Sequence, residues 1–247
     1  AKVNIFDMLR LAGIKTDIKI KNPSKTVRCE LNFQGLKNDA DIPERDRQRI
    51  KKVENLSSNG TKNVIIEIRK ESLDNFKALP LPITFYKNYQ KATQFIQSDS
   101  REIKNIAKEI SKLSGNDSLL FVKETLKWFS KNIKESMVEN FSALDTLKKG
   151  EGECQSHSYL FSAIMRAGNI PCRIVSGLVY PDGYNAFMYH SWCEVYLGKW
   201  VSVDPSLKQF PADSTHLVLA EGDIFSQAKI ANFMRNSGIK VLKIQYD

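Results

Sequence analysis

Residues 150–173 read GEGECQSHSYLFSAIMRAGNIPCR, and the interpretation of the whole chain starts from this stretch. After the cysteine, apolar residues recur at helical spacing until Gly168. The stretch therefore predicts a helix with Cys154 in its first turn and Gly168 at its end. Pro171 follows, and residues 173–180 are predicted to form a strand.

A thiol in the first turn of a helix is well placed to act as a nucleophile. The helix dipole and the unpaired backbone N–H groups favour the thiolate, and the same N–H groups can stabilise an oxyanion. Gly150 and Gly152 let the chain turn sharply before Cys154 and approach a substrate closely. A single cysteine is more often a small buried hydrophobic residue, so a catalytic interpretation needs partners for Cys154.

Residues 190–196 and 200–204 are predicted to form the two strands of one hairpin. A three-residue loop at 197–199 would put Tyr196 opposite Trp200 and gather the cysteine and valines of both strands on one face, as a core needs. A two-residue turn would shift the pairing by one residue and mix the two faces. We therefore predict the three-residue loop.

The same register brings His190 and Asp204 to one face of the hairpin, at diagonal positions within side-chain reach. A cysteine nucleophile needs a histidine as its base, and that histidine needs a group to orient it. We predict a catalytic triad in which Cys154 is the nucleophile, His190 the general base and acid, and Asp204 the orienting carboxylate.

Other polar and aromatic residues are weaker candidates. Trp192 and Tyr189 could line a substrate cleft, although large aromatic residues are more often part of a core. His157, three residues after Cys154, is interpreted as structural or surface-exposed, with no evident partner. His216 is expected in a loop without a function. The remaining cysteines are interpreted as packing residues: Cys29, Cys172 and Cys193.

Residues 1–97 are predicted to form a β-rich, basic accessory domain with the character of a sandwich. The expected strands are 17–20, 28–33 and 63–69. Asn59-Gly60 is a strong hairpin signal because both residues accept a positive φ. Residues 41–56 combine a helix-start pattern with the hairpin that follows them, and we favour a strand there.

Residues 98–247 are predicted to form the catalytic domain, which begins with helices. Asp99 and Glu102 have the spacing of a capping box, and the helical pattern after them ends at Gly115. Two further helices are expected, at 119–133 and 143–149.

Charge is unevenly distributed along the 247 residues. Residues 1–97 hold 19 Lys and Arg against 11 Asp and Glu, so most of the net charge of +9 belongs to them. Such a domain could contact an anionic surface or polymer, although a solvated surface is the more common meaning of such charge. No nucleic-acid-binding motif is present in the sequence.

Several classes of protein are disfavoured. No Cys-x-x-Cys pair is present, so we predict no structural zinc site. No apolar run is long enough to predict a transmembrane helix. The N-terminal residues lack both a starting Met and the apolar stretch of a signal peptide. The sequence is thus compatible with a piece of a longer protein, and its localisation, including an extracytoplasmic one, stays open.

Four blocks together resemble the transglutaminase-like superfamily. They are Gly152-Glu153-Cys154, Arg166–Arg173, His190–Tyr196 and Trp200–Ser206, in the order of the family pattern Gly-x-Cys, Arg-Ala-x-Gly-Ile-Pro-x-Arg, His-Ala-Trp-x-Glu-Val-Tyr and Trp-x-x-x-Asp-Pro-Thr. The resemblance covers roughly residues 98–225. The departures remove no catalytic group: Ser191 for Ala, Ser206 for Thr, and Asn169 inserted after Gly168.

The resemblance implies an α+β fold with a papain-like transglutaminase core, in which helices pack on an antiparallel sheet. It implies the same roles for Cys154, His190 and Asp204. No cofactor is expected, because the chain lacks the paired cysteines of zinc-binding glycan-removing relatives and an acidic cluster for calcium. The family includes cysteine proteases, amidases, deamidases and enzymes that cross-link glutamine to lysine.

Two hypotheses about function remain. The first is a thiol enzyme that transfers or hydrolyses acyl groups at amide bonds, with hydrolysis favoured by the breadth of the family. The second is a non-catalytic binding module on the same fold, in which the basic N-terminal domain contacts an anionic partner.

Overall fold

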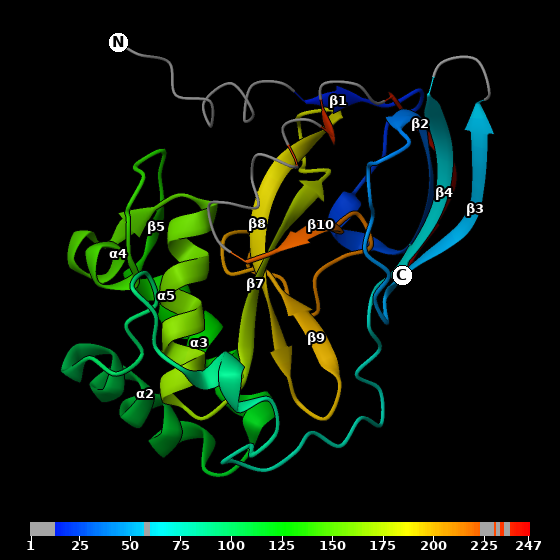
Figure 1. Cartoon of the computed structure of the whole chain (residues 1–247). Helices are drawn as coiled ribbons and strands as arrows, with labels where there is room; N and C mark the ends of the chain where they lie inside the picture. The colour runs from blue at the N-terminus through cyan, green and yellow to red at the C-terminus, as the bar shows by residue number, and fades with distance from the viewer. Residues whose placement is uncertain (1–12, 57–59, 223–229, 231–232, 235–237) are drawn as a thin grey trace. The chain divides into compact units, whose positions relative to one another are not determined.

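The fold is described from a computed structural model. The structure describes residues 13–56, 60–222, 230, 233–234 and 238–247. By their contacts, the residues form two compact units (Figure 1). The first unit comprises Ala1–Glu71, Val175–His190 and Ala212–Asp247, and the second comprises Ser72–Ile174 and Ser191–Pro211.

An antiparallel four-stranded sheet in the order β11-β2-β4-β3 lies in the first unit. Its strands are β2 (Thr26–Lys37), β3 (Gln48–Leu56), β4 (Thr61–Arg69) and β11 (Gly238–Tyr246). Alternate residues of β2 and β4 point to one face and are fully buried there, which explains their polar–apolar pattern. This apolar face forms the core of the first unit.

Most strand predictions for this part of the chain are confirmed. The segments 28–33 and 63–69 lie within β2 and β4, and residues 41–56 form a strand from Gln48 onward. Leu56 pairs with Thr61, so β3 and β4 form a hairpin. Asn59, half of the predicted turn, lies outside the described residues.

The strand predicted at residues 17–20 is wrong. Its alternating pattern does bury Ile20, but the segment has no strand assignment. The Asp17 carboxylate accepts hydrogen bonds from the backbone N–H groups of Ile18 and Val241, at 3.1 and 2.9 Å. These backbone N–H groups therefore bind a side chain, whereas a strand would pair them with the backbone of a neighbouring strand.

Strand β11 comes from the end of the chain, yet it pairs with β2 near the beginning. The four-stranded sheet is therefore built from both parts of the predicted division at residue 97. That division stays a prediction, because a compact unit defined by contacts need not be a part that folds by itself.

A second, antiparallel sheet has the order β1-β8-β7-β10, and β9 also pairs with β8. Its strands are β1 (Ile14–Lys15), β7 (Cys172–Val179), β8 (Ala186–Tyr196), β9 (Trp200–Val203) and β10 (Leu217–Glu221). Gly177 of β7 is required by close approach, since a Cβ there would lie 1.9 Å from the backbone oxygen of Leu217. The predicted α+β class is confirmed.

The helices of the second unit are α2 (Arg101–Ser114), α3 (Ser118–Asn132), α4 (Ala143–Lys149) and α5 (Cys154–Ala167). All were predicted, within a few residues at their ends. The predicted cap of α2 is wrong by one residue: Ser100, not Asp99, accepts the hydrogen bond from the backbone N–H of Ile103. A short parallel pair, β5 (Lys134–Glu135) and β6 (Glu151–Gly152), precedes α5.

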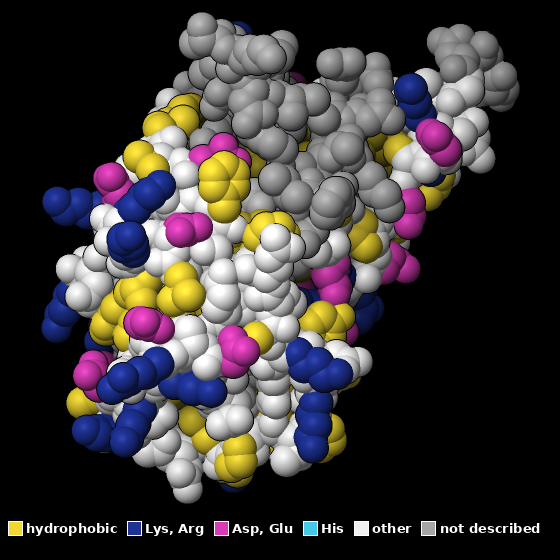
Figure 2. Space-filling model, turned by 60° about the vertical axis from the view of Figure 1, so that its left-hand side comes forward, with side chains coloured by type: hydrophobic (Ala, Val, Ile, Leu, Met, Phe, Trp, Pro, Cys, Tyr) yellow, Lys and Arg dark blue, Asp and Glu magenta, His cyan; other side chains and the backbone are white. Residues whose placement is uncertain are grey.

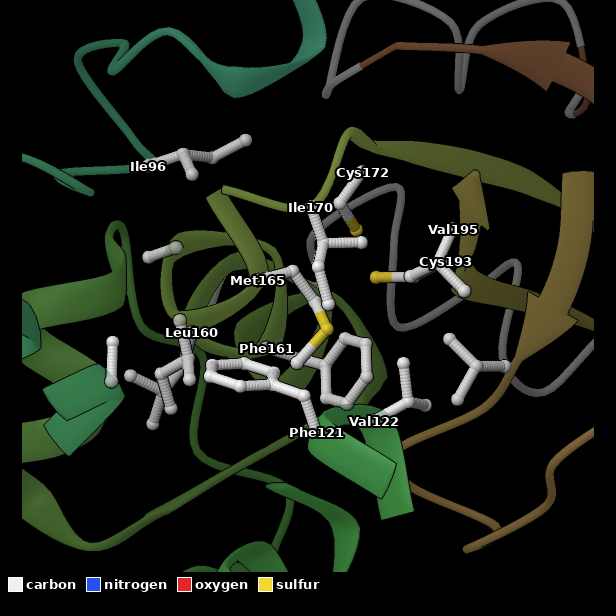
Figure 3. Packing of buried hydrophobic residues seen from close by; sticks show 14 of the residues in the cluster. Ile96, Phe121, Val122, Leu160, Phe161, Met165, Ile170, Cys172, Cys193 and Val195 are labelled. Carbon is white, nitrogen blue, oxygen red and sulfur yellow. The ribbon is translucent and has the colours of Figure 1, made fainter. Parts of the chain in front are cut away.

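Helix α5 is the central helix of the second unit, and nearly all of its residues are buried. Figure 3 shows Leu160, Phe161 and Met165 of α5 packed with Phe121 and Val122 of α3. The body of α5, which begins at Cys154, is therefore packed into the core of the second unit.

The described residues contain no helix that is both long and apolar enough to cross a membrane. On the face shown in Figure 2, the side chains of Lys and Arg alternate with those of Asp and Glu, and hydrophobic side chains lie between them. This face has the mixed character of an ordinary solvated surface.

Candidate active site

Cys154 is the first residue of α5, as predicted, and its side chain is buried. Glu153 is the N-cap: its carboxylate accepts hydrogen bonds from the backbone N–H groups of Gln155 and Ser156, at 2.9 and 2.8 Å. Gly152 is required just before it, because a Cβ would lie 2.6 Å from the Cβ of Ser156. The turn that presents the thiol is therefore set by close packing and by one carboxylate.

The Glu153 carboxylate also contacts the thiol, with 3.4 Å between Cys154 Sγ and Glu153 Oε2. The sequence suggested that unpaired N–H groups of the first turn would stabilise a thiolate. Instead, two of these groups bind Glu153, and a carboxylate beside the sulfur disfavours a second negative charge. In this contact the thiol is the donor and the Glu153 carboxylate is the acceptor.

Replacement of Glu153 by Gln tests this effect. We expect Glu153→Gln to raise the rate of Cys154 alkylation at pH 7 by up to about tenfold, because the negative charge beside the sulfur no longer opposes formation of the thiolate. The glutamine oxygen carries no charge and can still accept from the N–H of Ser156, so half of the cap is kept. The matched control is Glu151→Gln, which removes the same charge two residues away. A slower reaction in Glu153→Gln would mean that the carboxylate helps to deprotonate the thiol.

The predicted register of the β8–β9 hairpin is confirmed. Tyr196 pairs with Trp200, and Cys193 with Val203. The three-residue loop is closed by a 2.9 Å hydrogen bond from the N–H of Leu197 to the oxygen of Lys199. Four residues of the two strands share the buried apolar face, as expected: Cys193, Val195, Val201 and Val203.

Asp204 follows β9 directly and is completely buried. Its Oδ1 accepts hydrogen bonds from the backbone N–H groups of Ser206 and Leu207, at 2.8 and 3.0 Å. Continuing the confirmed register by one residue places Asp204 opposite Trp192. The turn therefore orients the carboxylate through Oδ1.

His190 is buried in β8, in the part of that strand that belongs to the first unit. The boundary between the units falls directly after it, whereas Cys154 and Asp204 belong to the second unit. Strand alternation puts His190 and Trp192 on the same face of β8. The assembly of Cys154, His190 and Asp204 into one triad stays a prediction.

His216 lies in a loop just before β10, as expected, but the structure buries it completely. Its ring lies edge-to-face with that of His190, with 6.1 Å between centroids and 70° between planes. Its Nδ1 lies 3.2 Å from Oδ1 of the buried Asp213. The spacing Asp213-x-x-His216 was the available signal, and it is too common in loops to be informative alone.

Tyr189 and Trp192, the predicted substrate-binding residues, are both buried. Tyr189 points to the face opposite His190 by strand alternation and packs in the core of the first unit. Trp192 shares the face of His190, so it is the better of the two candidates. Contact of either ring with substrate stays a prediction.

His157 is structural, as interpreted, but the expectation that it lacks a partner is wrong. It is buried, and its Nε2 lies 3.3 Å from the backbone oxygen of Lys134. Its Nδ1 lies 3.2 Å from Oγ of Ser206 and 3.3 Å from Oε2 of Glu135. His157 therefore joins the first turn of α5 to β5 and to the turn after Asp204.

The other three cysteines are buried packing residues, as predicted. Burial, together with the charges of Asp213 and Glu30, raises the pKa of the Cys29 thiol to about 12. Cys172 and Cys193 direct their sulfur atoms toward each other in the core (Figure 3). Burial, with Cys172 as neighbour, raises the pKa of Cys193 well above its ordinary value.

Comparison with known proteins finds a family match for part of the chain. The family model of the transglutaminase-like superfamily matches residues 104–205. A solved structure of a candidate cysteine protease from Cytophaga hutchinsonii is 15% identical, with a TM-score of 0.54 over 91% of this chain and 90% of that chain. The periplasmic domain of TgpA from Pseudomonas aeruginosa is 13% identical, with a TM-score of 0.50 over 83% and 91%. These likenesses show a shared fold, and none of the curated proteins matches the chain in sequence.

Proposed function

Because residues 104–205 match the family model of the transglutaminase-like superfamily, we propose that this chain is a thiol enzyme that cleaves amide bonds of peptides or proteins. Cys154 is the nucleophile, His190 the general base and acid, and Asp204 the group that orients His190. No cofactor takes part in this scheme.

The observation that carries the proposal is the register of the β8–β9 hairpin. It puts Tyr196 opposite Trp200, which is the pairing that a His190–Asp204 contact requires. The buried, doubly hydrogen-bonded carboxylate of Asp204 supports it further, since an orienting group must itself be fixed.

The chemistry proceeds in two steps. The sulfur of Cys154 attacks the carbonyl carbon while His190 takes the thiol proton. The C–N bond then breaks, His190 gives that proton to the leaving nitrogen, and a thioester remains on Cys154. In the second step, water attacks the thioester, His190 takes a proton from the water, and the sulfur leaves and regains a proton.

Water is our preferred second-step nucleophile, so we propose hydrolysis. The structure from Cytophaga hutchinsonii, a candidate cysteine protease, supports this choice by analogy. If the amine of a lysine attacked the thioester instead, the same residues would form a cross-link between glutamine and lysine.

The test is the rate of Cys154 alkylation by iodoacetamide across pH, in the wild type and in His190→Ala, read by peptide mapping. We expect Cys154 to react faster than the other thiols, and His190→Ala to lower its rate at pH 7 by roughly tenfold or more, because the thiolate then loses the imidazolium that would stabilise it. Cys29, Cys172 and Cys193 are internal controls. Equal rates for all four cysteines would contradict the proposal.

The basic charge of residues 1–97 remains a proposed surface for an anionic partner. Part of this charge is already neutralised within the first unit: Arg28 and Arg69 pair with Glu67, and Arg47 pairs with Glu71. The paired Glu67 carboxylate has its pKa lowered: burial alone would raise it, but the two arginines outweigh burial.

A further inference from the structure

We propose that His216 is a positioning residue for His190, and that the Asp213 carboxylate holds it in place. The inference rests on the proposed function, in which His190 is the general base. It goes beyond the triad because it adds a second, buried histidine–carboxylate pair to the site.

Asp213 defines which ring nitrogen of His216 carries a proton. Burial raises the pKa of the Asp213 carboxyl, but the charge and hydrogen bond of His216, together with two hydrogen bonds from Thr215, outweigh it, so the pKa lies below its ordinary value. An ionised carboxylate can only accept hydrogen bonds. Nδ1 of His216, at 3.2 Å, must therefore carry the proton.

Asp213 is itself held by several hydrogen bonds within the first unit. Its Oδ1 accepts from the N–H and the hydroxyl of Thr215, at 2.8 and 2.7 Å. Its backbone oxygen accepts from the guanidinium of Arg47 at 2.6 Å, and Arg47 pairs with Glu71 at 3.1 Å. These residues form a buried polar network that fixes the Asp213–His216 pair.

The imidazole rings of His190 and His216 are in contact. With 6.1 Å between centroids and 70° between planes, the rings of His190 and His216 meet edge-to-face. A ring that is buried and bonded at Nδ1 cannot rotate freely, so His216 restricts the plane that His190 can adopt. A general base must present one nitrogen at a defined angle, and misplacement by about 1 Å can cost a hundredfold in rate.

Two substitutions separate the ring contact from the bond to Asp213. His216→Asn keeps an N–H donor near the position of Nδ1 but removes the ring beside His190. His216→Phe keeps a ring beside His190 but removes the donor to Asp213. The readouts are the imidazole ¹H–¹⁵N signals of His190 and the separate values of kcat and KM on a peptide amide substrate. Only three histidines are present in the sequence, and His157→Asn identifies one set of signals.

We expect His216→Asn to shift the His190 signals and to lower kcat by about 10- to 100-fold with little change in KM. We expect His216→Phe to be intermediate in both readouts, because it keeps a ring beside His190 but loses the bond by which Asp213 holds that ring. The proposal is overturned if His216→Asn leaves both readouts unchanged. It is also overturned if His216→Phe is as impaired as His216→Asn, since the ring beside His190 would then contribute nothing, and a fully active His216→Phe would refute the role of Asp213.

Different outcomes test the proposed enzyme function and the positioning role of His216. If the wild type cleaves no amide, or if Cys154→Ala stays active, the proposed function fails. The His190 signals still test the positioning role in that case, because they are measured on the free protein and need no substrate.

Discussion

Cys154→Ala is expected to lose amide-cleaving activity by about 10⁴- to 10⁶-fold, the range found when the nucleophile of a catalytic triad is removed. The side chain is small and sits at the first position of α5, where Glu153 provides the cap independently of the thiol. The fold should therefore survive the change, so the loss reports the chemistry alone.

The matched control for the nucleophile is Cys29→Ala, which removes a fully buried thiol from the first unit. We expect this control to lower the free energy of unfolding by about 1 kcal/mol and to leave kcat unchanged. Initial rates on a peptide amide, with thermal unfolding of each variant, check both statements.

Retained activity in Cys154→Ala would refute the thiol mechanism. If wild type and variant were equally inactive on every amide but bound an anionic polymer equally well, the binding-module hypothesis would replace it. That binding would be expected to weaken with added salt, because exposed charges are screened.

Asp204→Asn should lower kcat by about 10² to 10⁴-fold, because an amide neither stabilises a developing imidazolium nor selects the required tautomer of the base. The substitution is nearly isosteric. The asparagine oxygen can still accept from the N–H groups of Ser206 and Leu207, which now orient the carboxylate. The turn after β9 should therefore keep its shape.

Ser206→Ala is the control for Asp204→Asn. It removes a hydroxyl from the same turn, where Ser206 contacts His157, but leaves the backbone N–H that binds Asp204. We expect its kcat to stay close to that of the wild type. An Asp204→Asn protein with normal kcat and normal thermal unfolding would show that Asp204 only stabilises the turn.

The register of the β8–β9 hairpin was predictable because burial of one face constrains it. A shift by one residue would have turned Val201 and Val203 away from the apolar core that they share with Cys193. The start of α5 was also predictable, because apolar residues recur at helical spacing only after Cys154, which directly follows the segment with Gly150 and Gly152. Alternation alone was insufficient at residues 17–20, because a strand also needs a partner for its backbone.

Two features of the site were not predictable. Glu153 was identified only as a member of a motif, yet its carboxylate caps α5 and contacts the thiol. His216 was assigned to a loop, yet it lies against His190 and binds Asp213. Both features depend on the direction of a side chain and on which segments pack together. Neither produces a repeating pattern in the sequence.

Residue spacing along the chain was enough to predict the α+β class, most of the helices and strands, the hairpin register and a set of candidate triad residues. These follow from local spacing and from the need to bury one face of each element. Three contacts became known from the folded structure alone: β11 with β2, His216 with Asp213 and His190, and Glu153 with Cys154. Such contacts join residues through packing of the whole chain or through the direction of a single side chain, and local preference does not specify either.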